Sequence, residues 1–386
     1  MSDIIIVTFD KSYYTTREEF NTLMINAANK VSKSIYKGFK FDSTTFILIR
    51  SKNKYGNIKT AIDNINNSLK EFAQISSNIH SKIFYIPKDL MFESSGQILK
   101  IIMQIIKTNR EFDNSIRTIT NYDIVKIENE IRISNLVDYC IKNEDVEINY
   151  QGIYAKDENR FAAAEALVRL RDKDNNIIYP QSFIPMVEED GRIVELGMII
   201  FKKVCQFMSK LDFEKLGLDY IEINLSPKQI LDPNFIETYT NIIKTYNVNP
   251  KNINLEITET SRGFSKNIID NINFLRNLGI TFSLDDFGTG NSNLNYIVNM
   301  PVDIVKFDKT MVTSYFKDDI ASLVVDYSIK MIKGLGHKIV FEGVENKNQI
   351  ELIDKMSVDY IQGYYYTKPI LEEKFLELIK NTNLKK

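Results

Sequence analysis

The chain has 386 residues, which is long for one small domain and suggests two domains at roughly 100–200 residues each. Its 49 basic and 51 acidic side chains give a formal net charge of −2, so no global field would attract nucleic acid or an anionic membrane. Two cysteines (Cys140, Cys205) and two histidines (His80, His337) are too few for a disulfide framework, a thiolate metal site or a three-histidine zinc site. Any bound metal must therefore use oxygen ligands, which favours Mg²⁺, Mn²⁺ or Ca²⁺.

Targeting and membrane signals are absent from the sequence. No apolar run approaches the ~18 residues of a spanning helix, and Met1–Val7 lacks the basic segment and cleavage site of a signal peptide. The sequence therefore predicts a cytoplasmic protein with no membrane segment, in a reducing setting that suits its two cysteines.

The first part of the chain, residues 1–123, predicts a small α/β domain with its own core. Short apolar runs indicate strands, and apolar residues at helical spacing indicate helices. The strand candidates are Ile4–Asp10, Thr44–Arg50 and Lys82–Ile86, and the helix candidates are Arg17–Lys33, Asn57–Phe72 and Gly96–Asn109. Helical spacing continues through Ile124–Ile141, so residues 124–143 are expected to form a connecting helix.

Residues 144–386 alternate short apolar runs with longer amphipathic ones, which predicts parallel strands joined by right-handed crossovers. Eight strand candidates in this length match the ~250 residues of a typical (β/α)₈ barrel. These strand candidates are Val146–Ile153, Ala162–Arg169, Tyr220–Leu225, Ile253–Thr258, Thr281–Asp286, Asp303–Asp308, Lys338–Glu342 and Tyr360–Tyr364. The helix candidates are Ile193–Ser209, Phe235–Tyr246, Asn267–Leu278, Ile320–Leu335, Asn348–Met356 and Glu372–Ile379.

The first two of these strands differ from the rest. Only Ala155–Phe161 separates them, which is too short for a crossover helix, so they should pair antiparallel. The expected fold class is therefore α/β, a modified (β/α)₈ TIM-like barrel with one antiparallel strand behind a smaller α/β domain.

Polar side chains interrupt the apolar strands near their carboxyl ends. Side chains two apart share a face of a strand, and carboxylates on a buried face are costly unless they lie at the mouth of a barrel, where active sites are found. Seven strands contribute such residues, namely Glu165, Asn224, Glu256, Asp285 with Asp286, Lys306, Glu342 and Gln362.

Carboxylates that converge on one mouth repel unless cations neutralise them. Carboxylate and amide oxygens form a ligand set for hard cations, and the ensemble would suit two-metal hydrolysis of a phosphate ester. Each residue alone has a simpler reading, because a strand-end glutamate is usually solvated and Asp285–Gly290 could be an ordinary turn. The joint pattern favours a site, whereas the cysteines and histidines fit packing or surface positions.

Ordered motifs over about residues 133–386 resemble those of EAL-domain cyclic di-GMP phosphodiesterases. Gly152 stands where that family has proline after Tyr150-Gln151, and Leu170 stands where it often has tryptophan. The matching segments are Glu165–Arg169, Phe183–Pro185 with Glu188, Asn224–Ser226, Leu255–Glu259, Asp285–Gly290, Lys306–Asp308, Glu342–Glu345 and Gln362–Tyr364.

The resemblance implies a role for each matching residue. Two divalent ions, Mg²⁺ or Mn²⁺, would occupy each active site. The implied metal ligands are Glu165, Asn224, Glu256, Asp285, Asp286 and Glu342, with Asp285 bridging. The implied catalytic residues are Lys306, which orients the attacking water, Glu342, as ligand or general base, and Glu165. The implied substrate contacts are Arg169, Gln151, Asp308, Gln362 and Leu167, and the supporting residues are Glu259 and Glu345.

Residues 1–123 resemble a degenerate GGDEF (diguanylate cyclase) domain. Asp42–Phe46 lies where the GGDEF motif would fall, without its two glycines or its acidic metal ligands, so cyclase activity is not expected. A regulatory scaffold is favoured, with GTP binding left open. The region begins directly at a strand, which leaves room for a sensor segment upstream.

The implied reaction is hydrolysis of one phosphodiester of cyclic di-GMP to linear pGpG by a homodimer. The alternative is a non-catalytic cyclic di-GMP receptor. Receptors of this type usually lack metal ligands or the Lys/Glu pair, and all of these are present here.

Overall fold

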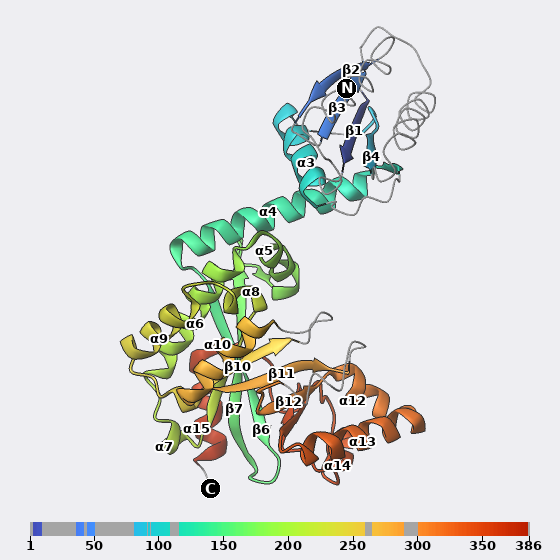
Figure 1. Cartoon of the computed structure of the whole chain (residues 1–386). Helices are drawn as coiled ribbons and strands as arrows, with labels where there is room; N and C mark the ends of the chain where they lie inside the picture. Colours follow the sequence, from blue (N-terminus) through green and yellow to red (C-terminus); the bar gives the residue numbers. More distant parts are fainter. Residues whose placement is uncertain are drawn as a thin grey trace. The chain divides into compact units, whose positions relative to one another are not determined.

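The computed structural model describes residues 3–9, 36–41, 45–50, 81–90, 92, 94–108, 116–258, 265–288 and 300–384. The chain divides into two compact units, Met1–Ile133 and Ser134–Lys386 (Figure 1). The expected helices Arg17–Lys33 and Asn57–Phe72 lie outside the described residues, as do His80 and Asp42–Thr44.

The first unit contains a five-stranded sheet with the order β2-β3-β1-β4-β5. Only β4 and β5 are parallel neighbours; the other pairs are antiparallel. The strands are β1 (Ile4–Phe9), β2 (Tyr36–Lys40), β3 (Thr45–Arg50), β4 (Ser81–Ile86) and β5 (Ile116–Thr118), and helix α3 spans Ser95–Thr108. The core of this unit joins Ile6, Phe84 and Ile101 to Ile124 and Ile127, so the strands and α3 pack with the next helix.

Helix α4 spans Asn121–Asn143 and contains the boundary between the two units. It begins three residues before the expected start because Thr120 and Asp123 cap each other: Asp123 Oδ2 accepts from Thr120 N at 2.9 Å, and Thr120 Oγ1 accepts from Asp123 N at 3.3 Å. The helix start was therefore marked in the sequence by a reciprocal cap of two polar side chains. Apolar spacing alone cannot predict such a cap.

Eight strands of the second unit close into a barrel, in the order β6-β7-β9-β10-β11-β12-β13-β14 and back to β6. Strand β6 is antiparallel to both neighbours, as expected for its pairing with β7, and the remaining pairs are parallel. The strands are β6 (Glu147–Ala155), β7 (Arg160–Arg171), β9 (Tyr220–Asn224), β10 (Ile253–Thr258), β11 (Thr281–Phe287), β12 (Ile304–Phe307), β13 (Lys338–Phe341) and β14 (Tyr360–Gln362). The predicted TIM-like barrel is confirmed.

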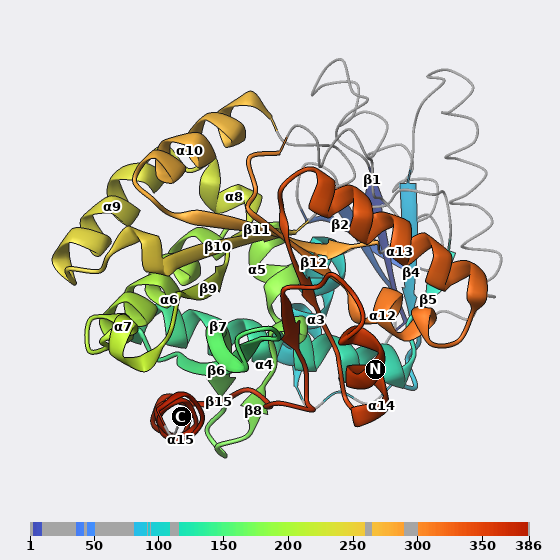
Figure 2. The ribbon, with the colours of Figure 1, turned by 90° about the horizontal axis from the view of Figure 1, so that it is seen from below.

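Helices cover the outside of the barrel (Figure 2). The six helices that amphipathic spacing predicted occur close to their expected positions, because one face of each can pack on the sheet. They are α6 (Ile193–Met208), α9 (Phe235–Thr245), α10 (Lys266–Asn277), α13 (Asp319–Gly334), α14 (Lys347–Ile353) and α15 (Glu372–Asn383). The other helices are α5 (Ile184–Asp190), α7 (Phe213–Leu216), α8 (Pro227–Ile230) and α12 (Lys309–Tyr315). There are also two strands of two residues each, β8 (Ile177–Ile178) and β15 (Ile370–Leu371), and 3₁₀ turns at Pro180–Ser182 and Pro250–Asn252.

The interior of the barrel is apolar at one end and becomes polar toward the carboxyl ends of the parallel strands. A buried apolar cluster includes Ile153, Ala163, Tyr220, Ile304 and Val340. On the parallel strands a polar side chain follows two residues later on the same face, as Glu165 follows Ala163 and Lys306 follows Ile304; on the antiparallel β6, Gln151 comes two residues before Ile153. None of the helices within the described ranges is long and apolar enough to cross a membrane.

Candidate active site

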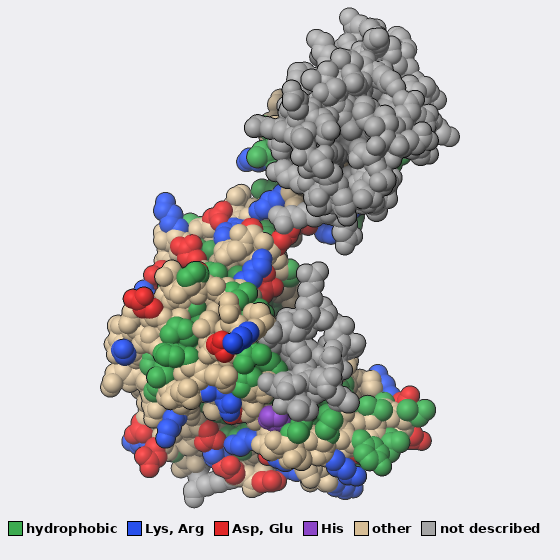
Figure 3. Space-filling model, viewed as in Figure 1, with side chains coloured by type: hydrophobic (Ala, Val, Ile, Leu, Met, Phe, Trp, Pro, Cys, Tyr) green, Lys and Arg blue, Asp and Glu red, His purple; other side chains and the backbone are tan. Residues whose placement is uncertain are grey.

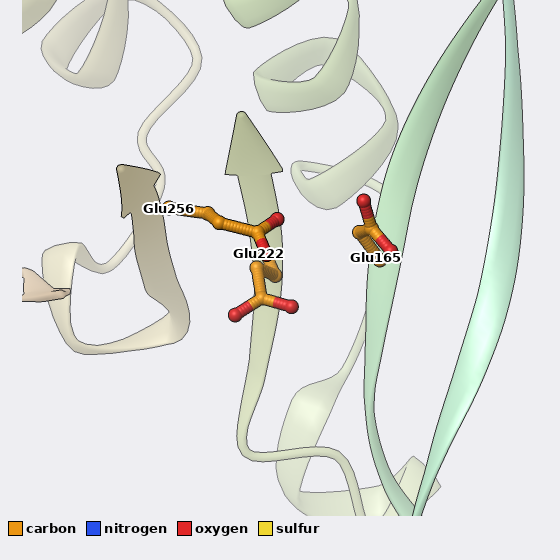
Figure 4. Close-up of side chains that lie close together, drawn as sticks. All are labelled: Glu165, Glu222 and Glu256. Carbon is orange, nitrogen blue, oxygen red and sulfur yellow. The ribbon is translucent and has the colours of Figure 1, made fainter. Parts of the chain in front are cut away.

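The predicted strand-end residues meet at the carboxyl end of the barrel because the strands run in register. Glu165 of β7 lies opposite Glu222 of β9, and Asn224 of β9 lies opposite Glu256 of β10. Figure 4 shows the three glutamates on neighbouring strands, with Glu256 reaching across toward Glu222. Their side chains are buried, with Glu222 and Glu256 at most 1% exposed.

Lys306 of β12 is fully buried within a ring of four glutamates. Its Nζ lies 3.0 Å from Glu222 Oε2 and 2.8 Å from Glu342 Oε1. The same atom donates a short hydrogen bond to Glu256 Oε1 and lies 3.8 Å from Glu165 Oε2. One cation therefore faces an excess of negative charge.

The electrostatics of this ring follow from burial and charge. Burial opposes the charge of Lys306, yet the surrounding glutamates raise the pKa of its ammonium well above the usual value. Burial raises the pKa of Glu256 well above its usual value, and Asp285 and Glu222 add to the shift. Burial also raises the pKa of Glu342 to about 8, although Lys306 acts in the opposite direction. Without further cations, Glu256 and Glu342 therefore favour their protonated forms.

Glu165 is oriented by two amides. Asn224 Nδ2 donates to Glu165 Oε1 at 2.8 Å, and Gln362 Nε2 donates to Glu165 Oε2 at 2.7 Å. Gln362 also lies 3.4 Å from Gln151 Oε1, and Gln151 Nε2 donates to the carbonyl of Thr367 at 3.0 Å. Gln362 Oε1 is buried with no hydrogen-bond partner.

The end of strand β11 places two aspartates at a bulge. The register shifts between Leu284 and Phe287, and Asp286 adopts a left-handed conformation with φ +57°. Burial raises the pKa of Asp286 to about 6, with further contributions from Asp285 and Asp308. Because the bulge breaks the alternation of the strand, both carboxylates can serve the same end of the barrel.

The residues fit a divalent cation. Carboxylate oxygens of Glu256, Asp285 and Glu342 all lie within 4.8 Å of one another, and so do those of Glu165, Glu222 and Glu256. Glu256 Oε2 and Asp285 Oδ1 are buried oxygens without a hydrogen-bond partner. Buried oxygens of this kind are costly unless a donor or an ion binds them, so the donor set suits a hard cation such as Mg²⁺ or Mn²⁺.

Two cavities flank Glu165. One, of about 370 Å³, is lined by residues that include Ile184, Pro185 and Asn224. The other, of about 290 Å³, is lined by residues that include Tyr364 and Glu342. Glu165 and Leu167 border both, so the carboxylate ring lies between two spaces that could each hold part of one ligand.

The remaining predicted residues differ in their burial and in their hydrogen-bond partners. Arg169 is buried, donates to the carbonyl of Val168 at 2.8 Å and lies 5.3 Å from the ring centroid of Tyr179. Burial lowers its pKa. Asp308 caps α12 by accepting from Thr310 N at 2.7 Å.

Glu345 forms an exposed ion pair with Lys309. Its carboxylate is therefore turned to a surface lysine in this structure. Glu259 and the segment after Gly288 lie outside the described residues.

Sequence reasoning did not select Glu222 as a site residue. Its position two residues before Asn224, on the same strand face, was the available signal, because β9 then carries two polar groups in line. The local sequence could not predict the pairing of Glu222 with Lys306, because the two residues lie on different strands and meet only in the folded barrel.

The fold and the site define a class of protein: a TIM-like barrel with one antiparallel strand and a carboxylate ring around a buried lysine. A sequence profile of the EAL domain matches residues 133–369, which is more than half of the chain, and the chain belongs to the EAL domain family.

Three known proteins show what the chain resembles. It is 29% identical over 267 residues to signaling protein YkoW of Bacillus subtilis, covering 68% of this chain and 32% of YkoW. It is 33% identical over 238 residues to the probable cyclic di-GMP phosphodiesterase PdeB of Escherichia coli, covering 61% of this chain and 45% of PdeB. The structure of the PaMucR phosphodiesterase in its c-di-GMP complex matches with TM-score 0.59 and 25% identity, covering 63% of this chain and 99% of that chain. The chain thus spans about a third of YkoW and less than half of PdeB.

Proposed function

We propose that this chain is a divalent-metal-dependent phosphodiesterase that hydrolyses one phosphodiester of cyclic di-GMP to linear pGpG. The observation that carries the proposal is the ring of glutamates around Lys306, with orphaned oxygens on Glu256 and Asp285, between two cavities. Membership of the EAL family and the similarity to a phosphodiesterase bound to c-di-GMP support the choice of substrate.

The proposed metal ligands are Glu165, Asn224, Glu256, Asp285, Asp286 and Glu342. Support comes from the close carboxylate oxygens of Glu256, Asp285 and Glu342 and from the approach of Glu165 to Glu256. Two divalent ions bound there would supply positive charge for the phosphate and would acidify a water nucleophile. The protein's own part is to hold this charge in a dry pocket. Lys306 balances the excess of carboxylates and donates hydrogen bonds toward the attacking oxygen. Glu342, whose Oε1 lies 2.8 Å from Lys306 Nζ, is the proposed ligand or general base at this position.

The two cavities suggest how the substrate lies. Cyclic di-GMP has two guanosines joined through two phosphates, and one guanosine in each cavity would place a phosphate over Glu165. Gln151, Gln362 and Leu167 border that position, so we propose that they contact the substrate. Arg169 follows Leu167 on the same strand face and would reach a phosphate, and Asp308 would contact the nucleotide after leaving its helix-capping bond.

The supporting residues act from further out. We propose that Glu345 steadies the segment after Glu342 through its ion pair with Lys309, and that Glu259 braces the segment that follows Asp285.

We also propose that residues 1–123 form a degenerate GGDEF domain with a regulatory role, joined by residues 124–143 to the catalytic barrel, residues 144–386. Support comes from the antiparallel pairing of β2 with β3, because β3 begins at Thr45, within the segment Asp42–Phe46 that resembles the GGDEF motif. GTP at millimolar concentration should change the hydrolysis rate if this domain senses GTP, and calorimetric titration of GTP would test binding directly. Absence of binding would leave a scaffold role.

A homodimer through helix α13 is proposed as the assembly. Ile320, Leu323, Val324 and Tyr327 are 55–74% exposed and form one stripe of the helix. Apolar side chains gather over this part of the surface at the lower right of Figure 3. The helix is acidic at its start and basic at its end, so a twofold antiparallel pairing would match opposite charges.

Sedimentation velocity tests the dimer. Leu323→Asp should convert it to monomer, whereas Leu231→Asp, which changes an exposed leucine elsewhere on the barrel, should leave the dimer intact. A monomeric wild type would contradict the assembly.

The decisive assay incubates the full chain with cyclic di-GMP and Mg²⁺ or Mn²⁺ and follows pGpG by chromatography. The expected result is metal-dependent pGpG formation that stops in EDTA. Binding of cyclic di-GMP without turnover, with either metal present, would instead establish a receptor.

A further inference from the structure

Glu222 is a buried carboxylate one layer below the mouth of the barrel. It is 0% exposed and lies two residues before Asn224 on β9. Its register partners are Glu165 on one side and Asn254 on the other, so it is enclosed by neighbouring strands (Figure 4). An isolated buried carboxylate costs several kcal/mol, so a partner must offset its charge.

Lys306 is that partner, with Nζ 3.0 Å from Glu222 Oε2. Within the described part of the chain, no other cation forms an ion pair with Glu222. The remaining three carboxylates that surround Lys306 are Glu165, Glu256 and Glu342. Each of these three is also a proposed ligand for divalent ions, so the ammonium and the ions compete for the same oxygens.

Glu222 lies one register step deeper than Glu256, because its partner on β10 is Asn254. Its side chain is also fully buried, whereas those of Glu165 and Glu342 are 11% and 19% exposed. Its carboxylate can therefore stay with Lys306 when the outer carboxylates turn to bound ions. If Glu222 carried no charge, Lys306 would form ion pairs only with the ligand carboxylates. Each divalent ion would then have to displace the Lys306 ammonium from those carboxylates.

We propose that Glu222 is a positioning residue that holds the Lys306 ammonium from below and thereby keeps Glu165, Glu256 and Glu342 available to divalent ions. This inference rests on the proposed function, because it concerns the ions and the lysine of the same site. It is a role that the mouth residues alone do not supply.

The test is a calorimetric titration of the full chain with Mn²⁺, independent of any turnover. Glu222→Gln keeps the shape of the side chain and removes its charge, and we expect Mn²⁺ affinity to fall at least tenfold. Glu222→Asp restores the charge with a shorter reach and should recover part of the affinity. In the hydrolysis assay, Glu222→Gln should lower kcat at saturating Mn²⁺ while the KM for cyclic di-GMP changes less than threefold, because Lys306 is displaced and the cavities are not.

Asn254→Ala is the matched control. Asn254 is fully buried in the same layer, where it bonds Thr281 and Ser283 and makes no ion pair with Lys306. This variant should lose stability yet keep Mn²⁺ affinity within about twofold. An equal loss of affinity in Asn254→Ala and Glu222→Gln would reduce Glu222 to a structural residue and overturn the proposal.

A double variant separates competition from misfolding. In Glu222→Gln/Lys306→Met, the competing ammonium is gone, so Mn²⁺ affinity should exceed that of Glu222→Gln alone, even if the single variant folds poorly. No recovery in the double variant, or unchanged affinity in the single one, would overturn the proposal. A wild type that binds Mn²⁺ but releases no pGpG would contradict the proposed function alone, since the affinity comparison would still stand.

Discussion

Lys306 is the residue on which the electrostatics of the site depend. Lys306→Met leaves Glu222 and Glu256 buried without their cation, and breaking a buried ion pair in this way typically costs about 3–5 kcal/mol. We expect turnover of cyclic di-GMP to fall by about a thousandfold or more, because loss of one preorganised donor alone costs 10²–10³.

The control for this variant is Lys333→Met, which breaks a half-buried ion pair with Asp359 elsewhere on the barrel. It should lose some stability and keep its turnover. Initial rates and melting temperatures measured on both variants make the comparison. Equal turnover in the two variants would show that Lys306 has no part in the reaction.

The raised pKa of Glu342 predicts how the metal-free protein responds to pH. Its folded-state pKa is about 8 against an ordinary value of 4.5, so its contribution to stability is full below pH 4.5 and is lost as pH rises through 8. Between these values one such group lowers the free energy of unfolding by at most about 1.4 kcal/mol per pH unit. Glu222 and Glu256, whose pKa values burial also raises, act in the same direction.

Melting temperatures in EDTA should therefore fall from pH 5.5 to pH 8. In saturating Mn²⁺ the same series should flatten or reverse, because ions bind the deprotonated carboxylates. The lowered pKa values of Asp3 and Asp123 do not interfere, since their effect lies below pH 4. A melting temperature in EDTA that rises over this range would contradict the buried, metal-free ring.

Individual residues of the site could be predicted to different degrees. Glu165, Glu256 and Lys306 were visible because a polar residue on the inward face of an apolar strand has few explanations other than a barrel mouth. Glu222 has the same sequence signal but was not selected, because a carboxylate deeper in a strand is acceptable only when paired. Its partner comes from another strand, and only the closed barrel brings the two together.

Among the elements, the segments that follow β13 and β14 make a close contact between Val344 and Gly363. A Cβ on Gly363 would lie 2.0 Å from the carbonyl oxygen of Val344 and 2.4 Å from its nitrogen, and both atoms are backbone. Gly363→Ala must therefore move the end of β14, which carries Gln362. We expect a loss of about 1–3 kcal/mol in stability, together with reduced turnover.

Gly334→Ala is the control, because a Cβ there meets nothing within 4 Å and the residue is the last of α13. Alanine in a helix should raise stability by about 0.5–1 kcal/mol. Chemical denaturation of both variants gives the comparison. Native-like stability in Gly363→Ala would mean that the two strand ends are not packed as described.

Elements were predictable from the sequence where they bury a regular face. The eight barrel strands and the six predicted barrel helices occur within a few residues of their expected positions, because period-two and helical spacing reflect burial. Strand β5, with only three exposed residues, and β2, whose sequence includes Gly38 and two lysines, carry no such pattern. Helices α5 and α8 have prolines in their first turns and are too short for a spacing signal.

At the scale of the whole molecule, α4 belongs to both compact units. Its N-terminal residues Ile124 and Ile127 are in the core of the first unit. Its C-terminal part is tied to the barrel by Arg192, which donates to the carbonyl of Ser134 at 3.2 Å and to Asp138 at 2.6 Å. The barrel therefore needs residues from Ser134 onward, although the β6 strand begins only at Glu147.

This division predicts how truncated chains behave. A chain that starts at Asn121 retains all of α4, so it should melt at the temperature of the barrel's own transition in the full chain and should hydrolyse cyclic di-GMP. A chain that starts at Asp145 lacks the buried Val137, Cys140 and Ile141, and burial of such side chains is worth about 1.5–3 kcal/mol each. It should melt at a clearly lower temperature in differential scanning calorimetry. Equal melting temperatures for the two truncated chains would show that α4 contributes nothing to the barrel, and its role would then be limited to the first unit.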